Sequence, residues 1–320
     1  MVDEPRPTVE TIKTYRSFNI LSLDGGGVRG TVEAVLVDRI EEEFPKFARN
    51  LDLITGVSTG AIQALAIAAD KRPPVVRDMF EKCAKFIFAD SFLDDFRDVW
   101  KLSGADYSNK NLRKLLDAQF GDMRLRDLDK KVAIVTFDLD NDAGINSPEV
   151  RTWKPKIFHN YPGPDSDGEE RVVDVALRSC AAPTFFPTYQ GYCDGGVAAN
   201  NPCMVALAMA LDPRAGEVDL EAIKILSLGA GKSGRYIKGN NHDWGVVQWA
   251  PKILYMLLEG PIEMANFQAK MILKDRFHRV DPPLRAPFSL DDWKKTPEMV
   301  DLATEFNLEP TIKWLETNWK

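Results

Sequence analysis

The sequence has few cysteines, no excess of positive charge and no long apolar run, and each absence excludes a class of protein. Its four cysteines, Cys83, Cys180, Cys193 and Cys203, have neither Cys-x-x-Cys spacing nor the density of a disulfide scaffold. We therefore expect mostly buried, reduced thiols in a reducing compartment. The formal net charge of −7 argues against a nucleic-acid surface or a strongly basic membrane patch.

No run of about 18 apolar residues occurs, and the polar N-terminus lacks the apolar core of a secretory signal. These features predict a cytoplasmic protein whose contact with membranes, if any, is peripheral. Residues 1–16 are polar and contain proline, so we expect a flexible lead-in. The remaining composition, 44% hydrophobic and 28% charged over 320 residues, is typical of a globular protein with a sizeable core.

A serine between two glycines is the strongest local signal for chemistry. Ser58 lies in Gly56-Val57-Ser58-Thr59-Gly60, after a short apolar run at residues 51–54 and before an Ala-rich segment at 61–69. Such a pattern is typical of a sharp strand-to-helix turn, in which glycines avoid a clash and the serine hydroxyl is exposed beside helix amides. It predicts a nucleophile elbow followed by a buried helix.

A second strand, loop and helix unit comes earlier in the chain. The apolar residues 18–23 run into Asp24-Gly25-Gly26-Gly27-Val28-Arg29-Gly30, and apolar residues then recur at helical spacing. Two such units in succession favour a parallel sheet with covering helices and place both loops at one sheet edge. The loop satisfies the Gly-x-Gly-x-x-Gly pattern of dinucleotide sites, but Asp24 and the nearby elbow favour an oxyanion hole made by its amides. Arg29 is expected to brace the loop.

Further strands are expected at residues 132–137, 150–158, 189–193, 222–228 and 276–280. Further helices are expected at 111–120, 172–180, 203–211, 244–275 and 297–318. An aromatic-rich segment, 79–100, reads as an amphipathic helix whose aromatic stripe packs in the core or, less favoured, forms a lid or lipid-facing wall. The Gly231-Lys232-Ser233 sequence lacks the first glycine of a P-loop, since Leu226 stands there, and is interpreted as a turn.

Ser58 needs a base to accept its proton. His242 and His278 follow it in the chain order of α/β-hydrolases, but both lie in segments where a structural role is more plausible. Asp194, at a strand end before Gly195-Gly196, is the stronger candidate, because desolvation raises the pKa of a carboxylate and makes it a better base. A Ser-Asp dyad is chemically sufficient.

The three motifs around Asp24, Ser58 and Asp194, in this order and spacing, resemble the patatin-like phospholipase family of lipid acyl hydrolases. The likeness covers roughly residues 17–235, including Ala181-Ala182-Pro183-Thr184-Phe185-Phe186-Pro187 and Asn200-Asn201-Pro202. It implies a three-layer α/β/α fold with a largely parallel sheet. It also implies Ser58 as nucleophile, Asp194 as base, oxyanion amides at Gly25, Gly26 and Gly27, and no catalytic histidine.

Together these observations predict a serine hydrolase of glycerolipid esters that needs no cofactor and no metal. We expect a lead-in at 1–16, a catalytic domain at 17–285 and a C-terminal helical segment at 286–320 packed on it. The expected partners are a phospholipid or other acyl ester and a lipid surface, with no nucleic acid; an activator is left open. Two alternatives remain: a histidine-assisted esterase of small soluble esters, and a nucleotide-binding or regulatory module that uses the glycine loop.

Overall fold

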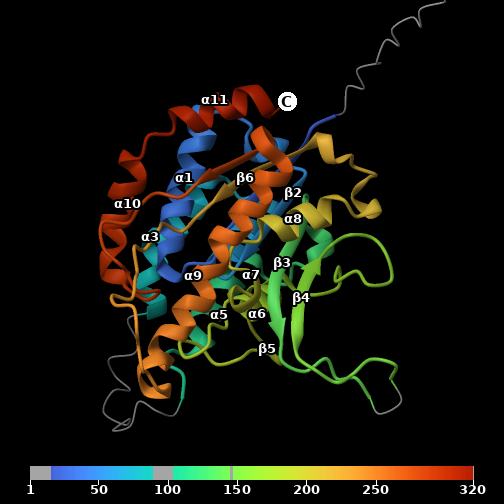
Figure 1. Cartoon of the computed structure of the whole chain (residues 1–320). Helices are drawn as coiled ribbons and strands as arrows, with labels where there is room; N and C mark the ends of the chain where they lie inside the picture. Colours follow the sequence, from blue (N-terminus) through green and yellow to red (C-terminus); the bar gives the residue numbers. More distant parts are fainter. Residues whose placement is uncertain (1–15, 89–103, 145–146, 320) are drawn as a thin grey trace, which may run out of the picture.

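The computed structural model describes residues 16–88, 104–144 and 147–319, and a mixed β-sheet forms its centre (Figure 1). The strands are β1 (Phe18–Leu23), β2 (Leu53–Val57), β3 (Lys131–Asp138), β4 (Lys154–His159), β5 (Tyr192–Asp194), β6 (Ile223–Leu228) and β7 (Phe277–Val280). They are ordered β4-β3-β2-β1-β6-β7, with β5 also paired to β3. Every pair from β3 to β7 along this order is parallel, while β4 and β5 run antiparallel to β3. The predicted, largely parallel α/β sheet is confirmed.

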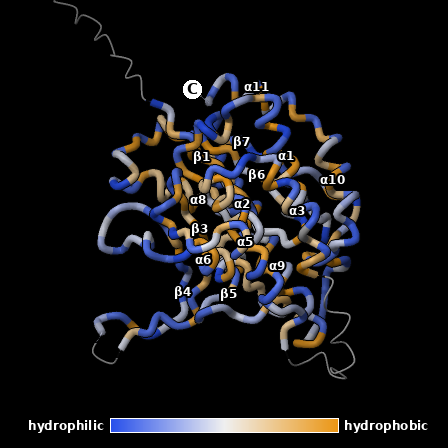
Figure 2. The backbone as a smooth tube through the Cα atoms, turned by 180° about the vertical axis from the view of Figure 1, so that it is seen from behind, coloured by the Kyte–Doolittle hydropathy of each residue, from blue (hydrophilic) through white to orange (hydrophobic). Residues whose placement is uncertain are grey.

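Helices cover both faces of this sheet. They are α1 (Gly30–Glu43), α2 (Thr59–Ala68), α3 (Pro73–Phe88), α5 (Asn109–Phe120), α6 (Val172–Ser179), α7 (Gly196–Ala199), α8 (Cys203–Ala210), α9 (Val246–Leu273), α10 (Thr296–Glu305) and α11 (Glu309–Asn318). Successive side chains of a strand point to opposite faces, so Leu21 and Leu23 of β1 join one core with α1, α2, α3, α5 and α6. Phe18 and Ile20 join a second core beneath α8 and α9. The result is three layers, with apolar residues concentrated centrally (Figure 2).

The carboxyl ends of three neighbouring strands meet at one edge. Leu23 of β1 pairs with Gly56 of β2 and with Leu228 of β6. The glycine loop, the serine turn and the turn after β6 therefore open side by side, as the two strand-loop-helix units predict. Helix α2 is buried from Gly60 to Ala68, in agreement with its apolar sequence.

Two strands differ from the prediction at their starts. The expected strand at 150–158 begins only at Lys154, because its partner β3 ends at Asp138, opposite that residue. Val150 and Trp153 are consequently exposed. The expected strand at 189–193 is a turn at its start, where Gln190 and Gly191 have positive φ, and β5 begins at Tyr192.

The C-terminal helices pack on the outside of α1. Arg39 of α1 donates to the carbonyl oxygens of Ala303 and Phe306, both at 2.8 Å. Of the predicted aromatic helix, α3 contains the first part, whereas residues 89–103 lie outside the described residues, as does the lead-in at 1–15. No helix in the described ranges combines the length and apolar character that crossing a membrane requires.

Candidate active site

Ser58 occupies the tight turn between β2 and α2. Its backbone has φ 55° and ψ −125°, a conformation that costs a non-glycine residue energy and is typical of functional turns. A Cβ placed on Gly60 would lie 2.4 Å from the carbonyl oxygen of Asp24, so only glycine fits there. The Ser58 amide donates to Ser179 Oγ at 2.9 Å, and that hydroxyl donates to the Val135 carbonyl at 2.7 Å. These contacts fix the turn.

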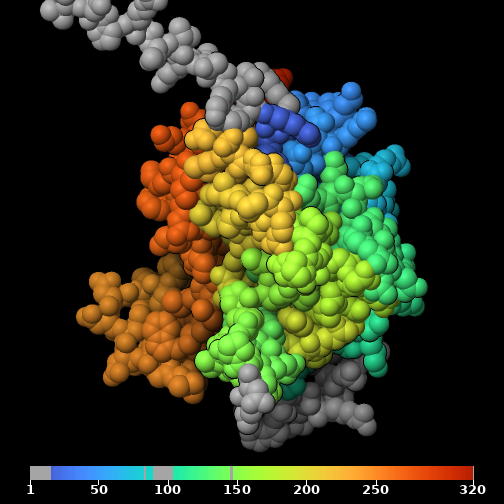
Figure 3. All heavy atoms as spheres, turned by 90° about the vertical axis from the view of Figure 1, so that its right-hand side faces the viewer, coloured from blue at the N-terminus to red at the C-terminus, as the bar shows by residue number. Residues whose placement is uncertain are grey.

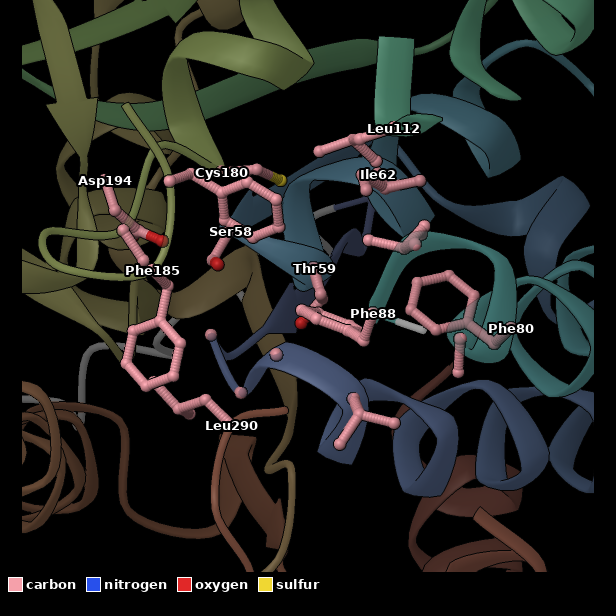
Figure 4. Close-up of a pocket in the computed structure, with 18 of the residues that line it drawn as sticks. Ser58, Thr59, Ile62, Phe80, Phe88, Leu112, Cys180, Phe185, Asp194 and Leu290 are labelled. Atoms are coloured by element: carbon pink, nitrogen blue, oxygen red, sulfur yellow. The ribbon is translucent and has the colours of Figure 1, made fainter. Parts of the chain in front are cut away.

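Asp194 ends β5 on the same side of the sheet and is only 2% exposed. Its Oδ1 accepts a hydrogen bond from the Gly196 amide at 2.7 Å. Burial raises the pKa of Asp194 to about 6, while the neighbouring Ser58 hydroxyl and the Gly196 amide oppose that rise. Ser58 and Asp194 thus lie together at one end of one pocket (Figure 4).

The glycine loop is packed against Ser58. A Cβ placed on Gly25 would lie 3.2 Å from Ser58 Cβ and 2.1 Å from Asn200 Oδ1. The three predicted oxyanion amides are not equivalent, because Gly25 donates its N–H to the Asn200 carbonyl at 3.0 Å. The N–H groups of Gly26 and Gly27 donate to no other described residue, so these two are the amides available to a ligand.

A buried charge cluster lies beneath this loop. The Asp24 carboxylate accepts hydrogen bonds from both terminal nitrogens of Arg279, at 3.0 and 2.6 Å. Arg279 also donates to Asp281 at 2.9 Å and to Ser227 Oγ at 2.8 Å, and the Asp24 amide donates to Glu33 at 2.8 Å. Burial raises the pKa of Asp24, and the Arg279 guanidinium opposes that rise. Asp24 therefore anchors the loop from behind and does not line the pocket.

Arg29 contacts the loop from another side and is buried. It donates through Nε to the Gly26 carbonyl at 3.3 Å and through Nη1 to Glu259 at 2.9 Å. Arg29 therefore contacts the loop as the sequence suggested, through one carbonyl and one carboxylate partner.

The segment that superficially resembles a P-loop is surrounded by carboxylates. Ser233 Oγ donates to Glu259 at 2.7 Å, the Gly231 amide donates to Asp281 at 3.0 Å, and Lys232 pairs with Glu263 at 2.8 Å. Because these three residues already bind carboxylates, their polar groups are not available to a phosphate, and the interpretation as a turn after a strand stands.

None of the three histidines, all of which are described, lines the pocket that holds Ser58. His278 lies on β7 with its Nε2 3.0 Å from Thr311 Oγ1, and its ring stacks on Trp314. His242 stacks on Trp244, with ring centroids 4.0 Å apart. His159 is buried beside Tyr161. These positions favour the structural roles that the sequence suggested.

The pocket beyond Ser58 is apolar and encloses about 840 Å³ including its mouth. The described part of the aromatic-rich segment, in α3, and the segment 180–186 both contribute to it. Its apolar walls come from α3, from 180–186 and from five other regions, and comprise Val28, Ile62, Met79, Phe80, Ala84, Ile87, Phe88, Leu112, Leu115, Cys180, Ala182, Phe185, Phe186, Leu258 and Leu290. Such a shape fits a hydrocarbon chain whose ester group lies at Ser58.

Comparison with known proteins adds to this geometry. The family model described as Patatin-like phospholipase matches residues 21–207. The cGAMP-activated phospholipase of Vibrio cholerae is 34% identical over 71% of this chain and 71% of that protein. Patatin-like protein 1 of Arabidopsis thaliana is 29% identical over 91% of this chain and 78% of that protein. The putative sporulation hydrolase CotR of Bacillus subtilis is 28% identical over 94% of this chain and 98% of that protein.

Proposed function

The chain belongs to the patatin-like phospholipase family and is a lipid acyl hydrolase, and we propose that Ser58 and Asp194 form its catalytic dyad. The observation that carries the proposal is their placement. A serine in a strained turn shares an apolar pocket with a buried carboxylate of raised pKa. The glycine loop lies against the serine. These groups together are sufficient for carboxylic ester hydrolysis.

In the first half of the proposed reaction, Ser58 Oγ attacks the carbonyl carbon of the bound ester and its proton passes to Asp194. Negative charge then develops on the carbonyl oxygen, and the Gly26 and Gly27 amides donate to it; Gly25 keeps its bond to Asn200 and shapes the loop. Asp194 returns the proton to the leaving alcohol, and the C–O bond breaks. The acyl chain remains attached to Ser58 in the apolar pocket.

In the second half, Asp194 takes a proton from water, and the hydroxide formed attacks the acyl-serine. The tetrahedral intermediate collapses, the proton returns to Ser58 and the fatty acid leaves. A carboxylate with a pKa near 6 is ionised at neutral pH yet is a stronger base than an exposed aspartate. Two amides and a carboxylate suffice for each step, so the reaction needs neither histidine nor a metal.

We propose glycerolipid esters, phospholipids or lysophospholipids, as the substrate class, presented at a lipid surface. The apolar walls around Phe80, Phe88 and Phe185 support this choice over small soluble esters, because a long acyl chain buries apolar surface against them and a short acyl group does not reach them. The cytoplasmic location and the domain bounds at 16/17 and 285/286 stay predictions from the sequence.

The proposal is tested by measuring fatty acid released from phospholipid vesicles and nitrophenol released from short and long acyl esters. Ser58→Ala and Asp194→Asn are expected to lose at least about a thousandfold in turnover, as removal of a nucleophile or its base does in other hydrolases. His242→Ala and His278→Ala are the matched controls and should retain activity. Since one relative is named for activation by cGAMP, each assay is run with and without that nucleotide.

Each alternative has its own outcome in this experiment. Full activity in Ser58→Ala would exclude the serine mechanism and would favour the alternative in which the glycine loop binds a ligand. Loss of activity in either histidine variant, with Asp194→Asn active, would establish the histidine-assisted esterase. A preference for short soluble esters with no release from vesicles would contradict the lipid class.

A further inference from the structure

One face of α9 carries an exposed apolar stripe that the hydrolase reaction does not use. At alternating steps of four and three residues lie Val246, Ala250, Ile253, Leu257, Gly260, Met264, Phe267 and Met271, all of them exposed. This α9 stripe contains no charged residue, and its mean spacing of 3.5 residues is the repeat by which one helix packs along another. The opposite face, with Leu258, Ala269 and Leu273, is buried against the body of the protein.

The stripe is too long and too apolar for an ordinary solvated helix face. Val246 is 82% exposed, Phe267 62% and Met264 59%, and Met256 and Val247 extend the apolar surface on both sides of the stripe. In Figure 1, α9 runs along the outside of the molecule, and in Figure 3 the orange part of the chain, which includes the first half of α9, projects from the body. Exposed apolar surfaces of this extent mark interaction sites.

We propose that the α9 stripe packs antiparallel against the same stripe of a second copy of this chain, about a two-fold axis beside Leu257 and Gly260. The order of side-chain sizes supports this occupant. When the helix is placed against itself in reverse, Ala250 falls opposite Phe267, and Gly260 falls opposite Leu257. Each small residue thus faces a large one, as tight packing requires. The remaining layers pair Ile253 with Met264 and Val246 with Met271.

The flanking residues are compatible with the same arrangement. Lys270 of one copy falls opposite Trp249 of the other, a pairing of cation and aromatic ring, and Glu263 falls opposite Met256. No two like charges meet. Pro261 has no N–H for the Leu257 carbonyl, so the most deformable turn of α9 lies at the two-fold axis, where both helices can adjust together.

The size of the contact is sufficient for association. A helix of 28 residues is about 42 Å long. Packing two such stripes together buries on the order of 1,000 Å² in total, which is the lower limit for a specific interface. The dimer would also restrain the helix that supports the active site, since α9 supplies Leu258 to the pocket wall and Glu259 to Arg29. The proposal itself does not depend on the reaction proposed for Ser58.

The first test measures the mass of the full chain in solution by light scattering and sedimentation over a concentration series. We expect a dimer that dissociates on dilution. Leu257→Asp and Phe267→Asp place charges in the stripe and should hold the chain at the monomer mass at every concentration. Trp153→Asp, which alters an equally exposed apolar residue on another surface, should leave the dimer intact. Unchanged circular dichroism shows that each variant is folded.

The second test fixes the partner and the register by oxidative cross-linking, with the wild type and its native cysteines as baseline. Ala250 and Phe267 are about 26 Å apart along one helix, too far for a disulfide within a chain. The double variant Ala250→Cys with Phe267→Cys should form covalent dimers, whereas Ala250→Cys alone should not. Cross-linking by Ala250→Cys alone indicates parallel helices and overturns the proposed register.

A lipid surface is the competing occupant of the stripe, and flotation with phosphatidylcholine vesicles separates the two. A wild type that stays monomeric at all concentrations overturns the proposal. If that monomer binds vesicles and Phe267→Asp abolishes the binding, the stripe is a membrane face. A dimer that persists in Leu257→Asp and Phe267→Asp alike also overturns it, because the contact then lies elsewhere.

Discussion

Replacing Asp194 by asparagine should stabilise the folded protein at neutral pH while it abolishes activity. Burial raises the pKa of this carboxyl from 3.8 to about 6, which means that the folded state disfavours the charged form. Asparagine has nearly the same shape and keeps the oxygen that accepts from Gly196. Asparagine has no charge at neutral pH, so folding of the variant does not have to desolvate a carboxylate at this position.

The magnitude follows from the same pKa difference. The pKa of Asp194 differs by about 2 between the unfolded chain, 3.8, and the folded protein, about 6. At 1.36 kcal/mol for each pKa unit, the charged carboxylate lowers the free energy of unfolding at pH 7.5 by about 3 kcal/mol. The pKa of about 6 already includes the hydrogen bonds that the carboxylate accepts, so we expect a net gain of up to about 3 kcal/mol and a rise of several degrees in Tm.

The pH dependence distinguishes this cause from better packing. Between pH 3.8 and about 6, the folded wild type binds more protons at Asp194 than the unfolded chain does, and its stability therefore falls as pH rises through this window. Because the variant does not titrate there, its advantage should be full above pH 6 and should vanish near pH 4.

The assay is thermal and urea unfolding of wild type and Asp194→Asn at pH 7.5 and near pH 4, with Ser58→Ala as a control that changes the site without removing a charge. An Asp194→Asn protein that is less stable than wild type at pH 7.5 would refute the reasoning. So would a difference that stays the same at both pH values.

Three further perturbations follow from the site. Arg279→Leu leaves the buried Asp24 carboxylate without its partner and should cost about 3 to 5 kcal/mol in urea unfolding, with Arg279→Lys intermediate; equal stability of all three would contradict the anchoring role. Ala84→Trp fills part of the apolar pocket and should lower turnover of long acyl esters relative to short ones, an effect absent if the chain binds elsewhere. Gly25→Ala brings a methyl group against Asn200 and should lower kcat by at least about tenfold with little change in unfolding, because the loop must shift.

The sequence indicated the parts of the site whose signal is local. The turn at Ser58, the glycine loop and the buried helix α2 each depend on a few adjacent residues, and the fold places them where those residues predicted. The strand that contains Asp194 was expected to start three residues early, because the positive φ of Gln190 has no strong sequence marker.

Contacts between distant segments were not predictable in the same way. Arg279 reaches Asp24 across 255 residues, and the sequence drew attention instead to its neighbour His278. The one available signal was a charged pair, Arg279 and Asp281, in and just after the short strand β7. Leu290 is a similar case: it follows a proline-rich turn with no periodic pattern, yet its side chain lines the pocket. Its carbonyl oxygen also accepts a hydrogen bond from the Val28 amide at 2.7 Å. The positions of such residues in the site depend on contacts between distant segments, which a local sequence pattern does not indicate.

The most direct test of the central claim is the rate at which a fluorophosphonate labels the protein as a function of pH, with the adduct located by peptide mass spectrometry. We expect a single adduct on Ser58, a labelling rate that rises with an apparent pKa of about 6, and a large loss of rate with no such titration in Asp194→Asn. An adduct on another residue, or an Asp194→Asn protein labelled as fast as wild type with the same pH profile, would contradict the Ser58–Asp194 dyad.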